Sequence, residues 1–162
     1  MPFSLGSRTY RVLTHPICFV AFGFGAGLSP CAPGTCGTLV AIPLYWLIHN
    51  LVWYKYLTIL LIATLVGIWI CAVAEQHMQI PDDAGIVWDE ICGYGFTMLA
   101  APHGVEWIVI GFILFRLFDI WKPWPIRQIE RLFKGGVGIM LDDLAAAAYA
   151  CCGIQLLSSI CL

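Results

Sequence analysis

Carboxylates are the residues of this chain whose grouping most clearly indicates chemistry. They come from three stretches of a largely apolar sequence, and the set is Asp82, Asp83, Asp89, Glu90, Asp119, Asp142 and Asp143. Brought together, such groups repel one another, raise one another's pKa values and require a cation. Carboxylate oxygens suit Mg²⁺ or Mn²⁺, which keep several waters and take one or two carboxylates together with phosphate oxygens. No histidine lies in these stretches, so zinc is disfavoured and Mg²⁺ or Mn²⁺ is the expected cofactor.

Two pairs of these carboxylates are adjacent in the sequence, Asp89 with Glu90 and Asp142 with Asp143. Adjacent residues on a helix point about 100° apart, so the two members of a pair cannot occupy equivalent positions. We expect one member of each pair to lie at the metal and the other in an outer position or beside a basic partner. For any single carboxylate, a solvated surface position is the alternative.

The segment from Phe115 to Gly136 supplies the basic partners. Arg116 and Asp119 are three residues apart and share a helix face. Arg116 also ends an otherwise uncharged run, where an arginine is expected to be paired or functional, and its planar fork suits phosphate oxygens. Lys122 directly precedes Pro123, where we expect the helix to end. Arg116 and Lys122 are therefore predicted to bind the substrate.

Beyond Pro123 the sequence has the pattern of a helix that lies at a bilayer surface. Its apolar stripe consists of Ile126, Ile129 and Phe133, and its polar side carries Arg127, Arg131 and Lys134. Arg127 is predicted to bind the substrate, whereas Arg131 and Lys134 serve equally well as anchors to anionic lipid.

A Gly- and Pro-rich segment, Phe22 to Leu39, precedes an apolar helix. Glycines allow successive backbone N–H groups to face an anion, and a helix N-terminus favours negative charge. Ser29 and Thr35 add hydroxyl groups, and we expect both to contact a phosphate. The segment lacks the GK[ST] ending of a Walker loop, and a re-entrant turn without a ligand is the alternative.

Composition places these residues in a membrane protein. Hydrophobic residues make up 60% and charged residues 11% of the 162 residues. A domain of this size has too little interior to hide that much apolar surface from water, so lipid is the expected surrounding. The pI near 6 argues against a nucleic-acid partner. The eight cysteines form no CxxC motif and lie mostly in apolar stretches, which indicates packing rather than zinc binding.

The expected fold is all-α, a multi-pass membrane bundle of about five to six helices with re-entrant or interfacial segments on the cytoplasmic face. Two uncharged stretches have spanning length, Leu57 to Ala74 and Leu144 to Leu162. The expected helices cover residues 39–53, 57–75, 86–101, 104–121 and 142–161, with a short helix near 16–22. We expect one domain over residues 1–162, with 1–15 as an N-terminal tail. Small-residue faces on the last helix allow a homo-oligomer.

Two helical hairpins bring the chemistry to one end of this bundle. One turns at Tyr54-Lys55-Tyr56 and the other at Pro102-His103-Gly104, and pairing residues by distance from the second turn places Asp89 level with Arg116. All aspartates then lie at one end, as do all basic residues except Lys55. By the positive-inside rule that end is cytoplasmic. Tryptophans near helix ends, Trp46, Trp53, Trp107, Trp121 and Trp124, fit the interfaces on both sides.

Three ordered segments resemble the phosphatidylglycerophosphatase A family, and together they cover nearly all of the chain beyond residue 20. They are GLSPCAPGTCGTLVAIPLYW (27–46), DDAGIVWDEICGY (82–94), and FRLFDIWKPWPI with KGGVGIMLDDLAAAAYA (115–150). The resemblance implies a Mg²⁺-dependent enzyme of the bacterial inner membrane, with its active site facing the cytoplasm. Such an enzyme hydrolyses the lipid phosphate monoester phosphatidylglycerophosphate to phosphatidylglycerol and inorganic phosphate.

The resemblance also implies roles for single residues. Implied metal ligands are Asp82, Asp89, Glu90, Asp119, Asp142 and Asp143, and all of these except Asp82 are also taken as catalytic. Implied charge stabilisers are Arg116 and Lys122. No Cys-x₅-Arg loop and no DxD motif is present, so attack by activated water is favoured over a covalent phosphoenzyme. The alternatives are a small ion or proton transporter, or another lipid-headgroup enzyme such as a CDP-lipid alcohol phosphotransferase, whose spaced signature is absent.

Overall fold

The computed structural model describes residues 5–161, and throughout this range the regular structure is helical. The elements are α1 (Leu5–Thr14), α2 (Pro16–Ala21), η1 (Gly23–Leu28), α3 (Pro33–Ile48), α4 (Trp53–Met78), α5 (Trp88–Thr97), α6 (Val105–Trp121), α7 (Ile126–Leu132) and α8 (Gly135–Cys161). The prediction of an all-α fold is confirmed.

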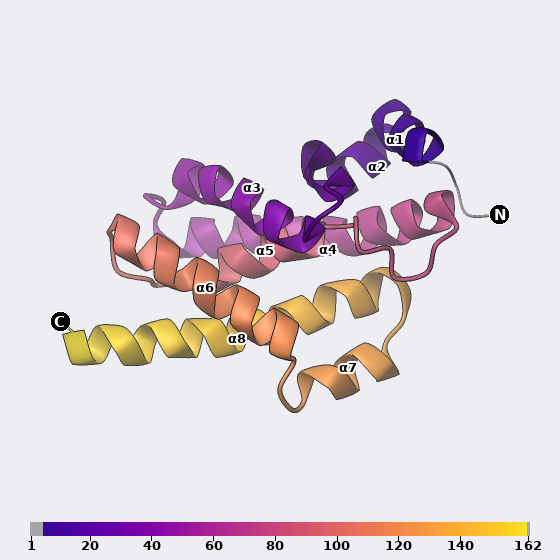
Figure 1. Ribbon diagram of the computed structural model, residues 1–162. Coiled ribbons are helices and arrows are strands. Elements are labelled where there is room, and N and C mark those ends of the chain that lie inside the picture. The colour runs from indigo at the N-terminus through magenta and orange to yellow at the C-terminus, as the bar shows by residue number, and fades with distance from the viewer. Residues whose placement is uncertain (1–4, 162) are drawn as a thin grey trace.

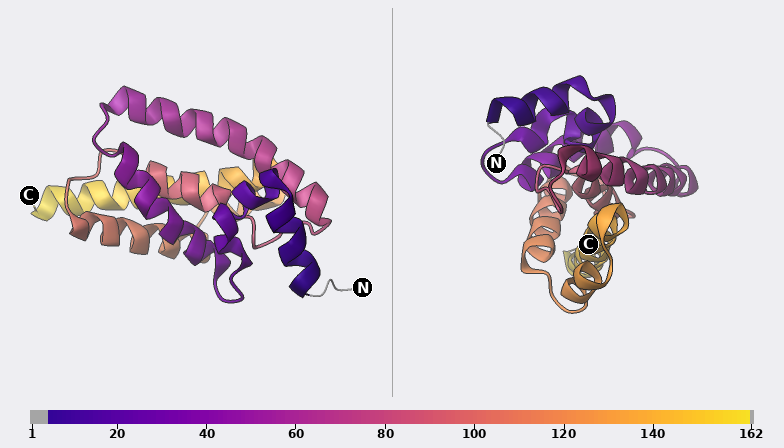
Figure 2. Two further views of the ribbon diagram at one scale, coloured as in Figure 1. Left: turned by 90° about the horizontal axis from the view of Figure 1, so that it is seen from above. Right: turned by 90° about the vertical axis from the view of Figure 1, so that its right-hand side faces the viewer.

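Helices α5 and α8 form the centre of the bundle. Seen from above, they lie between α4 along one edge and α6 along the other (Figure 2, left). Phe115 of α6 and Ala146, Ala147 and Ala150 of α8 are buried in one core cluster. Small residues on α8 let α6 approach closely and so fix the position of the polar groups at the end of α6.

The chain reverses direction at one end of the bundle and gathers its polar groups at the other. The α3–α4 turn, the α5–α6 turn and the C-terminal end of α8 lie together (Figure 1). The opposite end holds the start of α3, the end of α4, the start of α5 and the end of α6. Both predicted hairpins are therefore present, but the first turns at residues 49–52, since Tyr54, Lys55 and Tyr56 already belong to the first turn of α4. The counting that set Asp89 level with Arg116 agrees with an ion pair between Arg116 and Glu90, the neighbour of Asp89.

Two helices differ from their expected bounds in a way that matters for function. α3 begins at Pro33 rather than at residue 39, because a proline is well accommodated in the first turn of a helix. α8 begins at Gly135 rather than at residue 142, so Asp142 and Asp143 lie in the third turn and not at the helix start. The expected helices near 16–22 and over 104–121 are confirmed, and the predicted tail contains helix α1.

Two helices, α4 and α8, are long and apolar enough to cross a membrane by length and composition. α4 contains the predicted stretch from Leu57 to Ala74, and α8 contains the second stretch from Leu144 to Cys161, with Leu162 outside the described residues. The multi-pass arrangement expected for the remaining helices is not established by this criterion, since α3, α5 and α6 are shorter.

Candidate active site

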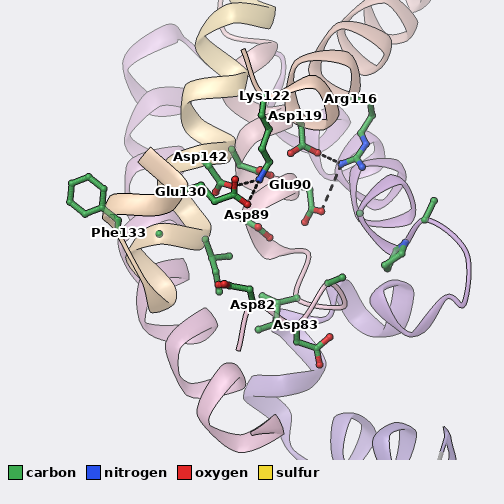
Figure 3. A pocket seen from close by; sticks show the side chains of 18 residues that line it. Asp82, Asp83, Asp89, Glu90, Arg116, Asp119, Lys122, Glu130, Phe133 and Asp142 are labelled. Atoms are coloured by element: carbon green, nitrogen blue, oxygen red, sulfur yellow. Dashed lines mark hydrogen bonds and ion pairs between the residues drawn. The ribbon is translucent and has the colours of Figure 1, made fainter. Parts of the chain in front are cut away.

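A cavity of about 320 Å³ opens at the polar end of the bundle. Its walls come from the start of α3, the segment before α5, the first turn of α5, the end of α6, and the helices α7 and α8. The predicted site residues in its lining are Asp82, Asp89, Glu90, Arg116, Asp119, Lys122, Asp142 and Asp143. Figure 3 shows Lys122 and Arg116 on either side of Asp119, above Asp89 and Glu90. Residues from distant segments thus meet at one site.

Asp89, Glu90 and Asp143 form the innermost group of carboxylates. One oxygen of each lies within 4.8 Å of the others. Asp89 Oδ1, Glu90 Oε2 and Asp143 Oδ2 are buried and have no hydrogen-bond partner. In the part of the chain that the structure describes, neither Asp89 nor Asp143 has a basic partner. Buried anionic oxygens without partners are costly, so the donor set fits a hard divalent cation.

Arg116 borders this group on the side of α6. Its Nη1 lies 2.5 Å from Asp119 Oδ2 and 3.8 Å from Glu90 Oε1. The first pair is the three-residue helix spacing expected from the sequence, and the second joins α6 to α5. The guanidinium is mostly buried, and its Nε has no hydrogen-bond partner. Arg116 therefore combines a fixed position with spare donor capacity, as anion binding requires.

Lys122 borders the cavity from the other side of the α6 terminus. Its Nζ donates to Asp142 Oδ2 at 2.7 Å and to Glu130 Oε1 at 3.0 Å. Partial burial lowers the pKa of Lys122, but the hydrogen bonds and charges of Asp142 and Glu130 outweigh it, so this pKa is raised above its usual value. Lys122 therefore stays an ammonium ion at physiological pH, which suits charge stabilisation rather than proton transfer.

The adjacent carboxylates of α8 divide as their helical positions predict. Asp142 points to Lys122, whereas Asp143 joins Asp89 and Glu90. The divergence of about 100° between neighbours on a helix accounts for this division. On α5 the division is less complete, because Glu90 both belongs to the carboxylate group and faces Arg116.

Asp82 and Asp83 lie apart from the inner group (Figure 3). Asp82 is exposed at the rim of the cavity, and its backbone N–H donates to Glu75 Oε1 at 3.2 Å. The Asp83 side chain is buried in an ion pair with Arg8 of α1 and accepts a hydrogen bond from the Gly85 N–H at 2.9 Å. Asp83 thus attaches the N-terminal helix to the segment before α5.

The N-terminus of α3 forms the wall that lies against Glu90 and Arg116. Ala32, Pro33 and Gly34 line the cavity there. A Cβ atom at Gly34 would lie 2.2 Å from Glu90 Oε1 and 3.0 Å from Arg116 Nη1. Only glycine leaves both groups in place at this position. The Gly/Pro-rich segment therefore reaches the site through its backbone.

Three residues of the cavity wall have left-handed backbone conformations that non-glycine residues rarely adopt. They are Ala32 with φ 47°, Asp82 with φ 50° and Lys122 with φ 46°. Ala32 is the N-terminal cap of α3, Lys122 is the C-terminal cap of α6, and Asp82 lies in a turn between α4 and α5. Such conformations cost about 1–3 kcal/mol each, and they cluster where a structure fixes the direction of functional groups.

The structure leaves three predicted substrate-binding residues outside this cavity. Ser29 Oγ donates to the Cys31 carbonyl at 2.8 Å, and Thr35 lies in the first turn of α3 without lining the cavity. Arg127 is exposed on α7 and donates to the Trp121 carbonyl at 3.1 Å. It lines two neighbouring hollows instead.

Sequence reasoning missed Glu130 and Gly34. Glu130 is an acid within a mainly basic amphipathic segment, and this exception is the signal that could have found it. Gly34 carries no comparable signal, because its role depends on the approach of α5 and α6 to the α3 terminus.

Comparison with known proteins places this site in context. The family described as Phosphatidylglycerophosphatase A matches the chain over residues 19–158. Phosphatidylglycerophosphatase A of Escherichia coli is 42% identical over 135 residues, covering 83% of this chain and 78% of that protein. Phosphatidylglycerophosphatase A of Haemophilus influenzae is 40% identical over 140 residues, covering 85% and 86%.

A third relative differs in its name. A Bacteroides thetaiotaomicron protein, named provisionally as a phosphatidylinositol-3-phosphatase, is 40% identical over 140 residues, covering 81% of this chain and 86% of that protein. No solved structure matches the chain with significance. The matched region contains every residue of the inner cavity named above, and the prediction of an enzyme, a phosphatase, is confirmed. The chain belongs to the phosphatidylglycerophosphatase A family.

Proposed function

We propose that this protein hydrolyses phosphatidylglycerophosphate to phosphatidylglycerol and inorganic phosphate, in the membrane and with Mg²⁺. The observation that carries the proposal is that one cavity contains both unpaired carboxylate oxygens and cationic side chains. Asp89, Glu90 and Asp143 provide partnerless carboxylate oxygens, and Arg116 and Lys122 provide cations at the rim. A phosphate monoester and a divalent cation together complement that set, whereas either one alone leaves charges unbalanced.

The inner carboxylates would hold the cation. Asp89, Glu90 and Asp143 are the first ligands by geometry, and Asp119 and Asp142 lie beside them as outer groups that orient Arg116 and Lys122. When bound, Mg²⁺ supplies Lewis-acid polarisation of phosphate oxygens and lowers the pKa of a water molecule. Asp82 is the weakest of the proposed ligands, because it is exposed at the rim and away from the inner group.

The remaining groups act on the phosphate. Arg116 and Lys122 neutralise its oxygens and the charge that develops in the transition state. The oxygen of water forms the new bond to phosphorus as the bond from phosphorus to the glycerol oxygen breaks, which yields inorganic phosphate and the free alcohol of phosphatidylglycerol. Glu130 and Asp142 hold Lys122 in position from both sides. Direct attack by water is favoured over a covalent intermediate, since the sequence has neither a Cys-x₅-Arg loop nor a DxD motif.

A membrane location is supported by the outer surfaces of α4 and α8. Only 33% of the most apolar window of α4 and 22% of that of α8 is buried, which disfavours core helices of a soluble domain. Exposed tryptophans mark both ends of the bundle, with Trp46 and Trp53 at one end and Trp121 and Trp124 at the other. Trp107 is an exception, since it is buried. The basic residues gather at the cavity end, which favours a cytoplasmic active site in a bacterial inner membrane.

A transporter is the competing function, since acids and an arginine within membrane helices often mark ion paths. Asp142 and Asp143 lie roughly 11 Å along α8 from its start, at 1.5 Å per residue. The acids are therefore near one end of a 27-residue helix and close to the surface cations. This location favours chemistry on a lipid headgroup.

The direct test is phosphate release by the purified protein in detergent with Mg²⁺. We expect release from phosphatidylglycerophosphate, and slower release, by about tenfold or more, from phosphatidylinositol 3-phosphate, because its secondary phosphate on a bulky ring fits the same cations less well. Folded protein that releases no phosphate from either lipid would refute the proposal. Faster release from the inositol lipid would indicate that the preferred substrate is the one in the name of the Bacteroides relative.

Gly34→Ala tests the α3 wall of the cavity. The new Cβ would displace Glu90 Oε1 and the Arg116 guanidinium, both flexible ends, so the fold is kept while the site is distorted. We expect kcat/KM to fall by roughly 10- to 100-fold, the effect of a displacement of about 1 Å in an active site. Gly6→Ala is the matched control, because nothing lies within 4 Å of its Cβ. Equal activity of the two variants would show that α3 does not shape the site.

A further inference from the structure

Three hollows surround the C-terminal end of α6, and each shares a cation with the next. The catalytic cavity shares Arg116 with an apolar groove on α6 and shares Lys122 with a second hollow beside Trp124. The groove and the second hollow in turn share Arg127 and Trp121. The catalytic cavity and the groove therefore adjoin at Arg116, close enough for one bound molecule to contact both.

The groove on α6 has a volume of about 820 Å³ and an almost wholly apolar lining. Its floor consists of Phe112, Ile113, Leu117, Ile120 and Trp121. Ile113 is 57% exposed and Ile120 is 70% exposed, so these side chains are not covered by any described part of the chain. Both charged residues that line the groove also line a neighbouring hollow, Arg116 the catalytic cavity and Arg127 the hollow beside Trp124. An apolar floor that ends in two arginines complements a lipid with an anionic headgroup.

Arg127 has a different environment from the two other cations. Arg116 and Lys122 contact carboxylates of the catalytic cavity, whereas the one hydrogen bond of Arg127 is to the Trp121 carbonyl. No acidic side chain pairs with Arg127 within residues 5–161. Its charge is therefore available to an anion that lies outside the catalytic cavity, where the apolar groove meets the hollow beside Trp124.

We infer that the α6 groove holds an acyl chain of the substrate and that Arg127 binds the phosphodiester that joins the two glycerols, while the terminal phosphate occupies the catalytic cavity. This inference rests on the proposed function and adds the position of the lipid to it. The substrate carries two phosphates in series, and the chain places cations in the same order, with Arg127 outside and Arg116 and Lys122 inside. Arg127 is then a specificity residue that distinguishes a lipid with two phosphates from phosphatidic acid, which has one.

The test uses three ligands, each measured as a substrate or as a competitor of phosphatidylglycerophosphate. They are phosphatidylglycerophosphate itself, its deacylated headgroup with both phosphates, and phosphatidic acid. For the two ligands with a phosphodiester, Arg127→Gln is expected to lower kcat/KM, or to raise the inhibition constant, by roughly 10- to 100-fold. For phosphatidic acid the same constants should change by no more than about twofold. Lys55→Gln, at the opposite end of the bundle, controls for loss of a surface charge.

Ile113→Trp tests the groove independently of the charge. The larger ring fills the apolar floor at an exposed position, so the fold is retained. For the two acylated ligands we expect kcat/KM to fall, or the inhibition constant to rise, by about tenfold. For the deacylated headgroup we expect no change in either constant. Leu65→Trp, at an exposed apolar position of α4 outside the groove, is the matched control.

The outcomes separate this inference from the proposed function. Equal losses on all three ligands in Arg127→Gln, or no loss on any, would overturn the assignment of Arg127. An Ile113→Trp variant equal to Leu65→Trp would show that bulk lipid merely covers the α6 face. Unaltered protein that releases no phosphate from phosphatidylglycerophosphate would overturn the proposed function and the lipid site together.

Discussion

Replacing Asp89 or Asp143 with asparagine is expected to lower kcat/KM on phosphatidylglycerophosphate by about a thousandfold or more. Both carboxylates are buried, have no basic partner within the described residues, and contribute a partnerless oxygen to the inner group. Loss of one anionic ligand would remove several kcal/mol of charge stabilisation, and about 4 kcal/mol corresponds to a thousandfold in rate. Phosphate release at saturating Mg²⁺ gives the measurement.

Glu106→Gln is the matched control for these substitutions. Glu106 is an exposed carboxylate in the first turn of α6, at the end of the bundle away from the cavity, so its amide should leave kcat/KM within about twofold. Asp119→Asn and Asp142→Asn should have intermediate effects, since these groups orient Arg116 and Lys122. Full activity of both Asp89→Asn and Asp143→Asn would rule out the carboxylate site as the catalytic centre.

The inner site could be predicted from the sequence because its members follow a simple geometric rule. Counting outward from the Pro102-His103-Gly104 turn places Asp89 level with Arg116, and the structure pairs Arg116 with the adjacent Glu90. The three-residue spacing of Arg116 and Asp119 and the helical divergence of Asp142 and Asp143 are equally local. Such relations depend on helix geometry alone, so a sequence is sufficient to state them.

The parts of the site that the sequence did not predict depend on tertiary contacts. The expected helix began at residue 142 because the uncharged stretch starts at Leu144, and the glycines at 135, 136 and 138 disfavour a helix by propensity. In the structure, α4 packs closely there, and a Cβ at Gly136 would lie 2.1 Å from the Ile68 carbonyl oxygen. Close packing of two helices outweighs the propensity of the glycines, so α8 begins at Gly135.

The fate of Asp83 illustrates a similar limit. In the sequence it belongs to the same group of acids as Asp82 and Asp89, although the family resemblance implies no metal-binding role for it. Its partner is Arg8, 75 residues away, and this pairing directs the carboxylate away from the inner group. No local sequence pattern predicts a contact between residues so far apart in the chain. The packing of α1 against the segment before α5 decides that Asp83 supports the fold and does not join the inner group.

Removal and return of Mg²⁺ should change the stability of the protein as well as its activity. A cation that binds only the folded state at about 100 times its Kd adds about 2.7 kcal/mol to the free energy of unfolding. For a domain of this size each kcal/mol raises Tm by about 2–4 °C, so we expect a rise of roughly 5–10 °C over protein in EDTA. Differential scanning fluorimetry in detergent measures this shift, and phosphate release should be lost in EDTA and recovered with Mg²⁺.

Asp143→Asn gives this measurement its sharpest form, because the metal-site hypothesis predicts opposite changes in two conditions. In EDTA the variant should have a higher Tm than the unaltered protein, since one of three neighbouring buried carboxylates no longer repels the others. With Mg²⁺ it should gain less than about 2 °C, because a ligand is lost. A residue that only supports the fold would behave differently, with a lower Tm in EDTA and an undiminished response to Mg²⁺. That second pattern would assign Asp143 to packing and would leave the cation without its innermost proposed ligand.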